Sequence, residues 1–235
     1  MTRRRWIADE VSGNHAALVG EHARHLSQVL RAQVGQEFDI STGAEVRRGR
    51  ISSVHLDRVE FQLGEVVAQL DKAAITVAIS IFKFDRMEWA IEKCTELGVA
   101  RIIPVIAGRT EPHLAAASLK RTERWRRLVH QASEQSRRVS PPEIEDPVKV
   151  NDVLELAAES RVVLAEMEEN LSLKDALRHG AGTVLLAFGP EGGWKPQEVA
   201  AFQSAGWTSA SLGAAILRAE TAIIAAVAIT ASFGR

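Results

Sequence analysis

Two glycine-containing segments near the C-terminus have the residue types and spacing of a ligand-binding site. One is Gly-Pro-Glu-Gly-Gly at 189–193, directly after the apolar run 183–188, and the other is Leu-Gly-Ala-Ala-Ile-Leu-Arg at 212–218. Apolar runs that end in glycine and lead into a helical segment are typical of strand ends in an α/β sheet. Because ligands of such sheets bind at the carboxyl ends of the strands, these two loops are the best candidates for a site.

The chemistry of the first loop favours some ligands over others. Its glycines can present backbone N–H groups to a phosphate, but the sequence contains neither G-x-x-x-x-G-K-S/T nor G-x-G-x-x-G. Pro190 removes one N–H donor, and the carboxylate of Glu191 repels phosphate. A cationic or neutral ligand is favoured instead, and a sulfonium such as S-adenosylmethionine suits the loop better than a polyphosphate. The competing interpretation is a tight turn without a ligand.

No second cluster of reactive side chains accompanies these loops. The seven histidines show no metal-ligand spacing with the single cysteine, Cys94, so we expect no metal site. His22 and His25 share a helix face but lack further ligands. Cys94 falls on one helical stripe with Met87 and Ile91, which predicts a packed core thiol rather than a nucleophile. One cysteine allows no internal disulfide, which suits a reducing compartment.

The elements that must position the loops form an α/β pattern over residues 73–235. The apolar run 75–82 predicts a strand buried on both faces of a parallel sheet. A helix follows, with Asp85 and Glu88 as a capping box, and the run 99–106 completes a βαβ unit. The continued alternation of strands and helices predicts a mainly parallel sheet.

Residues 1–72 have a different pattern and form a separate predicted domain. This region contains short β-leaning segments at 37–40, 50–54 and 58–63 and one helical segment at 22–30. Short strands at regular spacing are typical of a small β-barrel. The expected fold class is therefore α/β, with a small N-terminal β domain and a C-terminal parallel-sheet domain.

The charge balance excludes a global attraction to nucleic acid and leaves room for a local one. The chain has 29 basic and 30 acidic residues, a net charge of −1, and a local basic patch is enough to bind RNA. Segment 118–138 is the most basic stretch and is opposed only by Glu123 and Glu134. It is either a solvated helix face or a phosphate-tracking surface, and the local excess of base favours the second. No segment has the length and apolarity of a membrane span, so we expect a cytoplasmic protein.

Five blocks of sequence, in order, resemble the RsmE family of small-subunit rRNA uridine-N3 methyltransferases, which belongs to the SPOUT superfamily of knotted α/β methyltransferases. The blocks lie at 25–31, 85–99, 134–144, 189–194 and 212–222, so the resemblance covers nearly the whole chain. The most specific pair is Gly-Pro-Glu-Gly-Gly-Trp followed by Leu-Gly-x-x-Ile-Leu-Arg-x-Glu-Thr-Ala.

The resemblance implies a PUA-like RNA-binding β-barrel at 1–72 and a trefoil-knot methyltransferase domain at 73–235. It implies a homodimer that uses S-adenosylmethionine and methylates N3 of uridine 1498 in the 16S rRNA of the small ribosomal subunit. The cofactor residues that it implies are Leu164, Ala165, Phe188, Gly189, Pro190, Glu191, Gly192, Gly193, Leu212, Gly213, Ile216, Leu217 and Arg218. The RNA contacts that we expect are Arg3, Arg4, Arg5, Arg24, Arg31, Arg124, Arg127, Arg137 and Arg138.

Two residues of the last block are candidates for catalysis. We expect Arg218 to stabilise negative charge that develops on O2 or O4 of the uracil. Glu220 is the weaker candidate, because an acidic residue at the start of the last helix also stabilises that helix end. No general base is identified. Lys195 stands where relatives often have serine, so we expect a helix start without a side-chain acceptor.

Two other functions remain as alternatives. A nucleotide- or phosphate-binding α/β enzyme is disfavoured by Pro190, Glu191 and the missing dinucleotide motif. A non-catalytic RNA-binding or ribosome assembly protein with the same fold is disfavoured by the retained cofactor-loop motifs.

Overall fold

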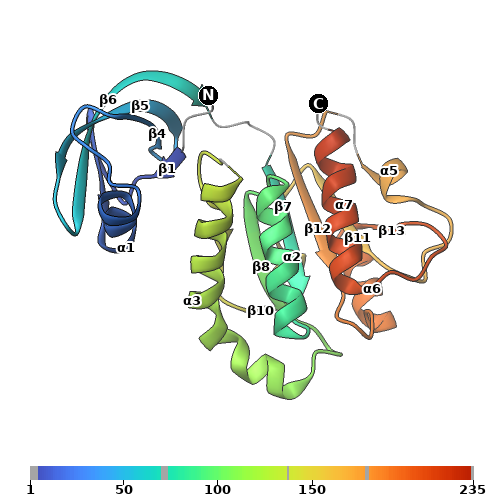
Figure 1. The fold of residues 1–235 in the computed structure, drawn as a ribbon. Coiled ribbons are helices and arrows are strands. Elements are labelled where there is room, and N and C mark those ends of the chain that lie inside the picture. The colour runs from blue at the N-terminus through green and yellow to red at the C-terminus, as the bar shows by residue number, and fades with distance from the viewer. Residues whose placement is uncertain (1–4, 70–73, 137, 178–179, 234–235) are drawn as a thin grey trace. The chain divides into compact units, whose positions relative to one another are not determined.

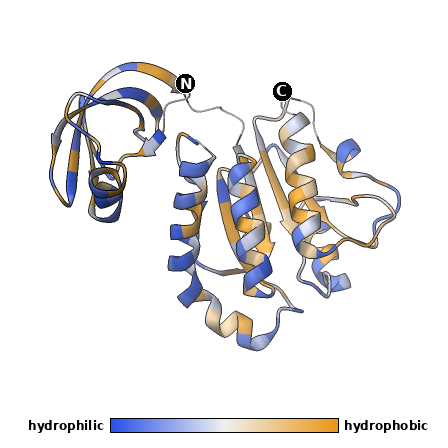
Figure 2. Ribbon diagram, in the orientation of Figure 1, coloured by the Kyte–Doolittle hydropathy of each residue, from blue (hydrophilic) through white to orange (hydrophobic). Residues whose placement is uncertain are grey.

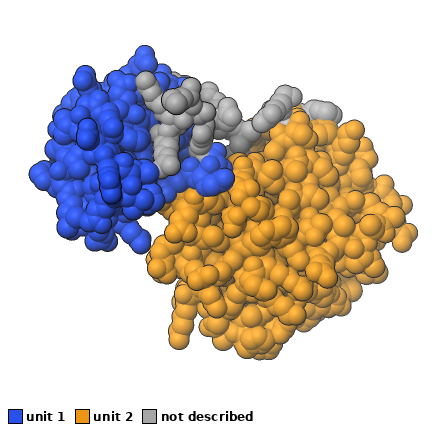
Figure 3. All heavy atoms as spheres, viewed as in Figure 1, with its two compact units in different colours: residues 1–71, 133–141 blue, residues 72–132, 142–235 orange. Residues whose placement is uncertain are grey.

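The chain forms two compact units (Figure 3). The computed structural model describes residues 5–69, 74–136, 138–177 and 180–233 (Figure 1). One unit contains residues 1–71 and 133–141, and the other contains residues 72–132 and 142–235. The predicted boundary between residues 72 and 73 lies outside the described residues. No local pattern in the sequence predicts that residues 133–141 belong to the N-terminal unit.

The N-terminal unit is built on a curled six-stranded sheet. Its strands are β1 (Arg5–Ile7), β2 (Glu10–Ser12), β3 (His15–Val19), β4 (Glu37–Ser41), β5 (Glu45–Val54) and β6 (Arg58–Gln69). Their order is β1-β4-β5-β6-β3-β2, and every pair is antiparallel except β1 with β4. Register shifts between β5 and β6 increase the local twist, which lets these long strands curl. A Cβ on Gly49 would collide with the side chain of Ile40, so the close approach of β4 and β5 requires glycine.

A short helical segment closes the core of this unit. It consists of α1 (Gly20–Arg24) and the π-helix η1 (His25–Val29), where a helix was predicted over 22–30. Leu26 on η1 is fully buried with Leu18, Ile40 and Phe61 of the sheet. Arg31 follows with φ of 51°, the one non-glycine residue of the described ranges with positive φ. The strands β4, β5 and β6 confirm the predicted β segments.

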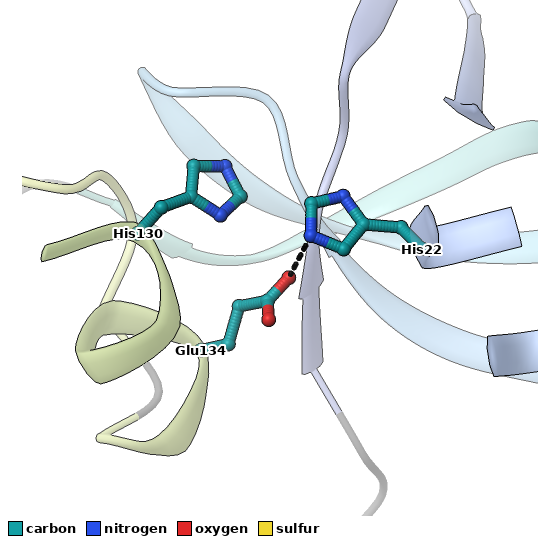
Figure 4. Close-up of side chains that lie close together, drawn as sticks. All are labelled: His22, His130 and Glu134. Atoms are coloured by element: carbon teal, nitrogen blue, oxygen red, sulfur yellow. Dashed lines mark ion pairs between the residues drawn. The ribbon is translucent and has the colours of Figure 1, made fainter. Parts of the chain in front are cut away.

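His22 on α1 lies between two carboxylates of the same unit. Its Nδ1 is 3.1 Å from Oδ1 of Asp9. Its Nε2 is 3.7 Å from Oε1 of Glu134, and Figure 4 marks this ion pair. The hydrogen bond to Asp9 raises the pKa of His22; partial burial opposes this rise, and the charge of Glu134 adds to it. Burial raises the pKa of Glu134. Protonated His22 therefore favours the folded state of this unit.

The C-terminal unit contains a sheet in which every strand pair is parallel, as predicted. Its strands are β7 (Ala74–Ser80), β8 (Arg101–Ile106), β9 (Glu143–Ile144), β10 (Val148–Lys149), β11 (Ser160–Leu164), β12 (Thr183–Phe188) and β13 (Thr208–Ala210). The order is β10-β8-β7-β12-β11-β13, and β9 pairs with β8 as well. Successive residues of β7 and β12 enter two different cores, so both faces of these strands are buried.

Helices cover both faces of this sheet. They are α2 (Phe84–Glu96), α3 (Pro112–Gln135), α4 (Val150–Leu154), α5 (Leu173–Ala176), α6 (Pro196–Ser204) and α7 (Ala219–Phe233). Residues of α2, α3, α5 and α7 share one core, whereas α4 and α6 share the other. Figure 2 shows the consequence, with apolar strands inside and much of α3 polar on its outer side. Within the described ranges no helix is both long and apolar enough to cross a membrane.

Helix α2 confirms the predicted core stripe and corrects its predicted start. Met87, Ile91 and Cys94 are completely buried, and burial raises the pKa of the Cys94 thiol to about 12, as expected of a packed thiol. The capping box is wrong: the N-cap residue is Lys83, which makes no side-chain capping bond. The carboxylate of Glu88 instead accepts a hydrogen bond from Nε of Arg124 at 2.8 Å. Because the helix begins at Phe84, Asp85 lies inside its first turn and not at the N-cap, so the predicted capping box does not form.

Candidate active site

Three parallel strands of the C-terminal unit end at the same level. β11 lies between β12 and β13, and the pairing register places Leu164 opposite both Phe188 and Ala210. The segments that follow these strands, 165–168, 189–194 and 211–218, therefore leave the sheet side by side. This meeting of strand ends is where ligands of parallel α/β sheets bind.

The glycine-rich loop 189–194 is fixed at its end by Trp194. The indole Nε1 donates a hydrogen bond to the carbonyl of Leu164 at 3.0 Å, and the ring packs edge-on against Phe202 at 5.0 Å between centroids. Gly193 has a φ of 68°, which favours glycine. A Cβ on Gly189 would lie 3.1 Å from the Trp194 nitrogen. The backbone conformation therefore favours glycine at 193, and the close approach of the Trp194 nitrogen favours it at 189.

The loop after β8 holds the glycine-rich loop and the start of α6. Arg109 Nη1 donates to the carbonyl of Gly192 at 2.6 Å. The carboxylate of Glu198 accepts from the backbone nitrogens of Gly108 and Lys195, both at 2.7 Å. Lys195 is the N-cap residue and provides no side-chain capping bond, as predicted. Glu198 offsets that loss, because it satisfies the N–H of Lys195 from within the first turn.

A cavity of about 360 Å³ opens between these loops and α6. Ala165, Gly192 and Gly193 line it and belong to the predicted cofactor residues. The remaining lining residues are Arg109, Glu166, Met167, Glu168, Trp194, Pro196, Val199, Ala200, Gln203 and Ser209. Its volume lies at the lower end of the range for small-molecule sites, roughly 300–1,000 Å³. The predicted residues of loop 212–218 do not line this cavity.

Glu191 is paired, which changes the electrostatic reason for expecting a cation. Its Oε1 accepts a hydrogen bond from Nη1 of Arg86, on α2, at 2.7 Å. Nε of the same guanidinium lies 3.9 Å from Oε1 of Glu220. The prediction treats Glu191 as an unpaired anion, and this is wrong. Arg86 was missed because it stands 105 residues earlier in the chain. The acidic residues that line the cavity are Glu166 and Glu168.

The two predicted catalytic residues have opposite environments. Arg218 is exposed, and within the described ranges its guanidinium forms no hydrogen bond or ion pair. Glu220 is only 7% exposed, and its Oε2 has no hydrogen-bond partner among the described residues. Gly213 has a φ of 106°, and residues 213–216 are exposed, with Ile216 at 87%. The second loop therefore presents apolar and cationic groups to its surroundings.

Some of the predicted RNA contacts are exposed and others are partly covered. Arg31 and Arg127 are exposed, whereas Arg5 and Arg138 are half-buried, and burial lowers the pKa of the Arg138 guanidinium. Arg24 is exposed but pairs with Asp57 at 3.0 Å. Arg3, Arg4 and Arg137 lie outside the described residues.

The arginines of segment 118–138 form ion pairs with more acidic residues than the sequence of the segment suggests. Arg121 and Arg124 both contact Glu88, and Arg126 contacts Glu123 and Asp146. Glu88 and Asp146 lie outside segment 118–138, so counting charges within the segment missed them. Among the predicted contacts on α3, Arg127 retains the more available charge.

Comparisons with known proteins agree with this geometry. A family model described as RNA methyltransferase domain matches residues 69–231. Ribosomal RNA small subunit methyltransferase E of Aquifex aeolicus is 31% identical over 234 residues, which cover 97% of this chain and 99% of that protein. The protein of the same name from Synechocystis is 33% identical over 212 residues, covering 87% of this chain and 68% of that protein.

Solved structures are similar over the whole length of the chain. The crystal structure of Ribosomal RNA small subunit methyltransferase E from Neisseria gonorrhoeae, bound to S-adenosyl methionine, superposes with a TM-score of 0.86 at 28% identity and covers 98% of both chains. A methyltransferase structure from Legionella pneumophila with bound cofactor has a TM-score of 0.84 at 26% identity, covering 99% of this chain and 98% of that one.

Proposed function

Because this chain belongs to the RNA methyltransferase domain family, we propose that it transfers a methyl group from S-adenosylmethionine to N3 of a uridine in 16S rRNA. The target implied by the family resemblance is uridine 1498 of the small subunit. The observation that carries the proposal is the alignment of three strand ends beside a cavity, in a fold whose solved relatives bind this cofactor. A substrate in the ribosomal subunit implies action in the cytoplasm.

The residues around the cavity fit the cofactor. Gly192 and Gly193 contribute only backbone to the lining, so a ligand can approach the main chain closely. The acidic residues Glu166 and Glu168 also line the cavity, and their negative charge suits a ligand that carries an ammonium and a sulfonium. When bound, S-adenosylmethionine supplies an electrophilic methyl group. The chain itself has to align the uracil, exclude water and assist loss of a proton.

The uracil must be presented with N3 accessible. N3 lies on the Watson–Crick edge, so the nucleotide must be unpaired or flipped out. N3 also carries a proton and has no free in-plane lone pair until that proton leaves. Arg218 is exposed and suited to donate hydrogen bonds to O2 or O4 as negative charge develops there. Oε2 of Glu220 is a buried acceptor without a partner among the described residues. It is suited to accept a hydrogen bond from N3–H of the uracil.

RNA binding and assembly are further parts of the proposal. Each unit contributes basic residues of its own, and among the described residues that are expected to contact RNA, Arg31 of the N-terminal unit and Arg127 on α3 are the most available. A homodimer is supported by the family resemblance and by the exposed apolar side chain of Ile216, 87% accessible beside the strand ends. Sedimentation velocity of the purified protein measures the oligomeric state directly.

One experiment tests the reaction. The protein is incubated with isotopically labelled S-adenosylmethionine and small subunits that lack native modification, and the labelled nucleotide is mapped. We expect N3-methyluridine at a single position. Methylation of another atom or nucleotide would overturn the assignment of the target. Tight RNA binding without any transfer would support the non-catalytic assembly protein instead.

A further inference from the structure

One guanidinium connects three elements around the candidate site. Arg86 lies in the first turn of α2, Glu191 in the glycine-rich loop and Glu220 in the first turn of α7. Nη1 of Arg86 lies 2.7 Å from Oε1 of Glu191, and its Nε lies 3.9 Å from Oε1 of Glu220. The two carboxylates meet different nitrogens of one fork, an arrangement that a lysine ammonium reproduces poorly.

The Glu220 carboxylate is buried more deeply than a helix-stabilising acid requires. Its side chain is 9% exposed, against 35% for Arg86. An acidic residue can favour the N-terminus of α7 while fully solvated. Burial of a carboxylate costs free energy unless a cation or hydrogen bonds compensate it. Here Oε1 faces Arg86, while Oε2 has no hydrogen-bond partner in the described part of the chain. A buried acceptor left open in this way suits an N–H donor brought by a ligand.

We propose that Arg86 is a positioning residue, which holds the glycine-rich loop through Glu191 and holds Glu220 with Oε2 available to the N3–H group of the target uracil. This rests on the proposed function. Arg86 acts through the two carboxylates and has no direct part in the transfer. Its ion pair with Glu191 ties the loop to α2, so loss of the guanidinium loosens the loop and leaves both acids without their cation.

The test combines cofactor-site binding with chemistry. The variants are Arg86→Ala, Arg86→Lys, Glu191→Gln and the double variant Arg86→Ala with Glu191→Gln. Lys93→Ala is the control, because Lys93 forms ion pairs on the same helix with Glu92 and Glu96, outside the three-residue cluster. Calorimetry gives the affinity for S-adenosylhomocysteine, the demethylated and unreactive form of the cofactor. Rapid-quench experiments give the single-turnover rate on small subunits, and thermal unfolding checks the fold.

We expect Arg86→Ala to weaken S-adenosylhomocysteine binding roughly tenfold, the size of coupling found for residues in direct contact. The double variant should weaken it no further than Arg86→Ala alone, because both changes break one contact. Arg86→Lys should recover part of the affinity, and Lys93→Ala should behave as the unmodified protein. Additive effects of the two single changes would overturn the coupling of Arg86 with Glu191.

The variant Glu220→Gln tests which group donates a hydrogen bond to Oε2, the N3–H of the uracil or the amino group of the cofactor. It should leave S-adenosylhomocysteine affinity unchanged and slow the single turnover, since the uracil donates the N–H. A matching loss of cofactor affinity would instead assign the donor to the cofactor's amino group and overturn this part of the proposal. If the unmodified protein transfers no methyl group to RNA, the proposed function fails, and the coupling measured by calorimetry still decides the role of Arg86.

Discussion

The indole of Trp194 joins two of the three loops at the candidate site through one hydrogen bond. Replacing it with phenylalanine keeps the aromatic packing on Phe202 and removes the donor to the Leu164 carbonyl. We expect Trp194→Phe to lower the free energy of unfolding by about 1–2 kcal/mol, because a buried carbonyl loses its partner. Urea unfolding measures this, with Trp89→Phe at a 48% exposed position as control. Equal stability of the two variants would contradict the role given to the indole.

Arg218 is expected to act on the transfer step and hardly on cofactor binding. Arg218→Ala should retain the affinity for S-adenosylhomocysteine and slow the single turnover about a hundredfold, the typical cost of removing a donor to a developing oxyanion. Lys174→Ala, which removes an exposed cation on α5, is the matched control. Loss of cofactor affinity with normal single-turnover chemistry would refute the assignment.

The titration of His22 gives the N-terminal unit a pH-dependent stability. The pKa of His22 in the folded state lies above the ordinary value of 6.5, so protonation stabilises the fold. This contribution is complete below pH 6.5 and is lost as the pH rises through the folded-state pKa. The difference in unfolding free energy between the unmodified protein and His22→Gln should therefore shrink as the pH rises above 6.5. A difference in unfolding free energy that grows toward alkaline pH would contradict a stabilising role for protonated His22.

At the scale of elements, Glu198 links the start of α6 to the loop after β8. Its carboxylate accepts two backbone hydrogen bonds, from Gly108 and Lys195. We expect Glu198→Ala to destabilise the protein by about 1–2 kcal/mol, as for the loss of a good helix cap. Gln197→Ala, on an exposed position of the same turn, is the control. Chemical denaturation distinguishes the two, and an effect no larger than that of Gln197→Ala would contradict the linking role.

The long elements could be predicted from the sequence because burial leaves a clear pattern in them. The run 75–82 is apolar since both faces of β7 are covered, and the stripe of Met87, Ile91 and Cys94 marks the buried face of α2. Strands such as β2 and β9 have two or three residues, too few to show any period. The predicted capping box is wrong because α2 begins at Phe84, which leaves Asp85 within the first turn, where it cannot act as the N-cap.

The candidate site was predictable only in part, because some of its residues come together only through tertiary packing. The strand-end rule located 189–193, and it applies equally to the loop after β8, where Arg109 could have been noticed. Arg86 lies on a helix and reaches the site only through tertiary packing. An ion pair between residues far apart in the chain produces no local sequence pattern. The pairing of Glu191 with Arg86 therefore became visible only in the structure.

At the scale of the whole molecule, binding to RNA should depend steeply on salt. Each phosphate contact contributes roughly 0.7 to 0.9 to the slope of log affinity against log salt concentration. Arg127→Ala should reduce that slope by about 1, whereas Arg124→Ala should reduce it less, because Nε of Arg124 already bonds Glu88 at 2.8 Å. Filter binding at several salt concentrations measures both slopes. An affinity insensitive to salt would count against this surface.

The strand order of the parallel sheet has a consequence for biosynthesis. β7 pairs with β8 on one side and with β12 on the other, and β12 is made more than a hundred residues later. During translation one edge of the apolar strand β7 therefore stays unpaired until residue 188, the last residue of β12, has left the ribosome. An unpaired apolar strand edge invites association with other chains. We expect the nascent protein to depend on chaperones during this interval and to lose that dependence once β12 takes its place at the centre of the sheet.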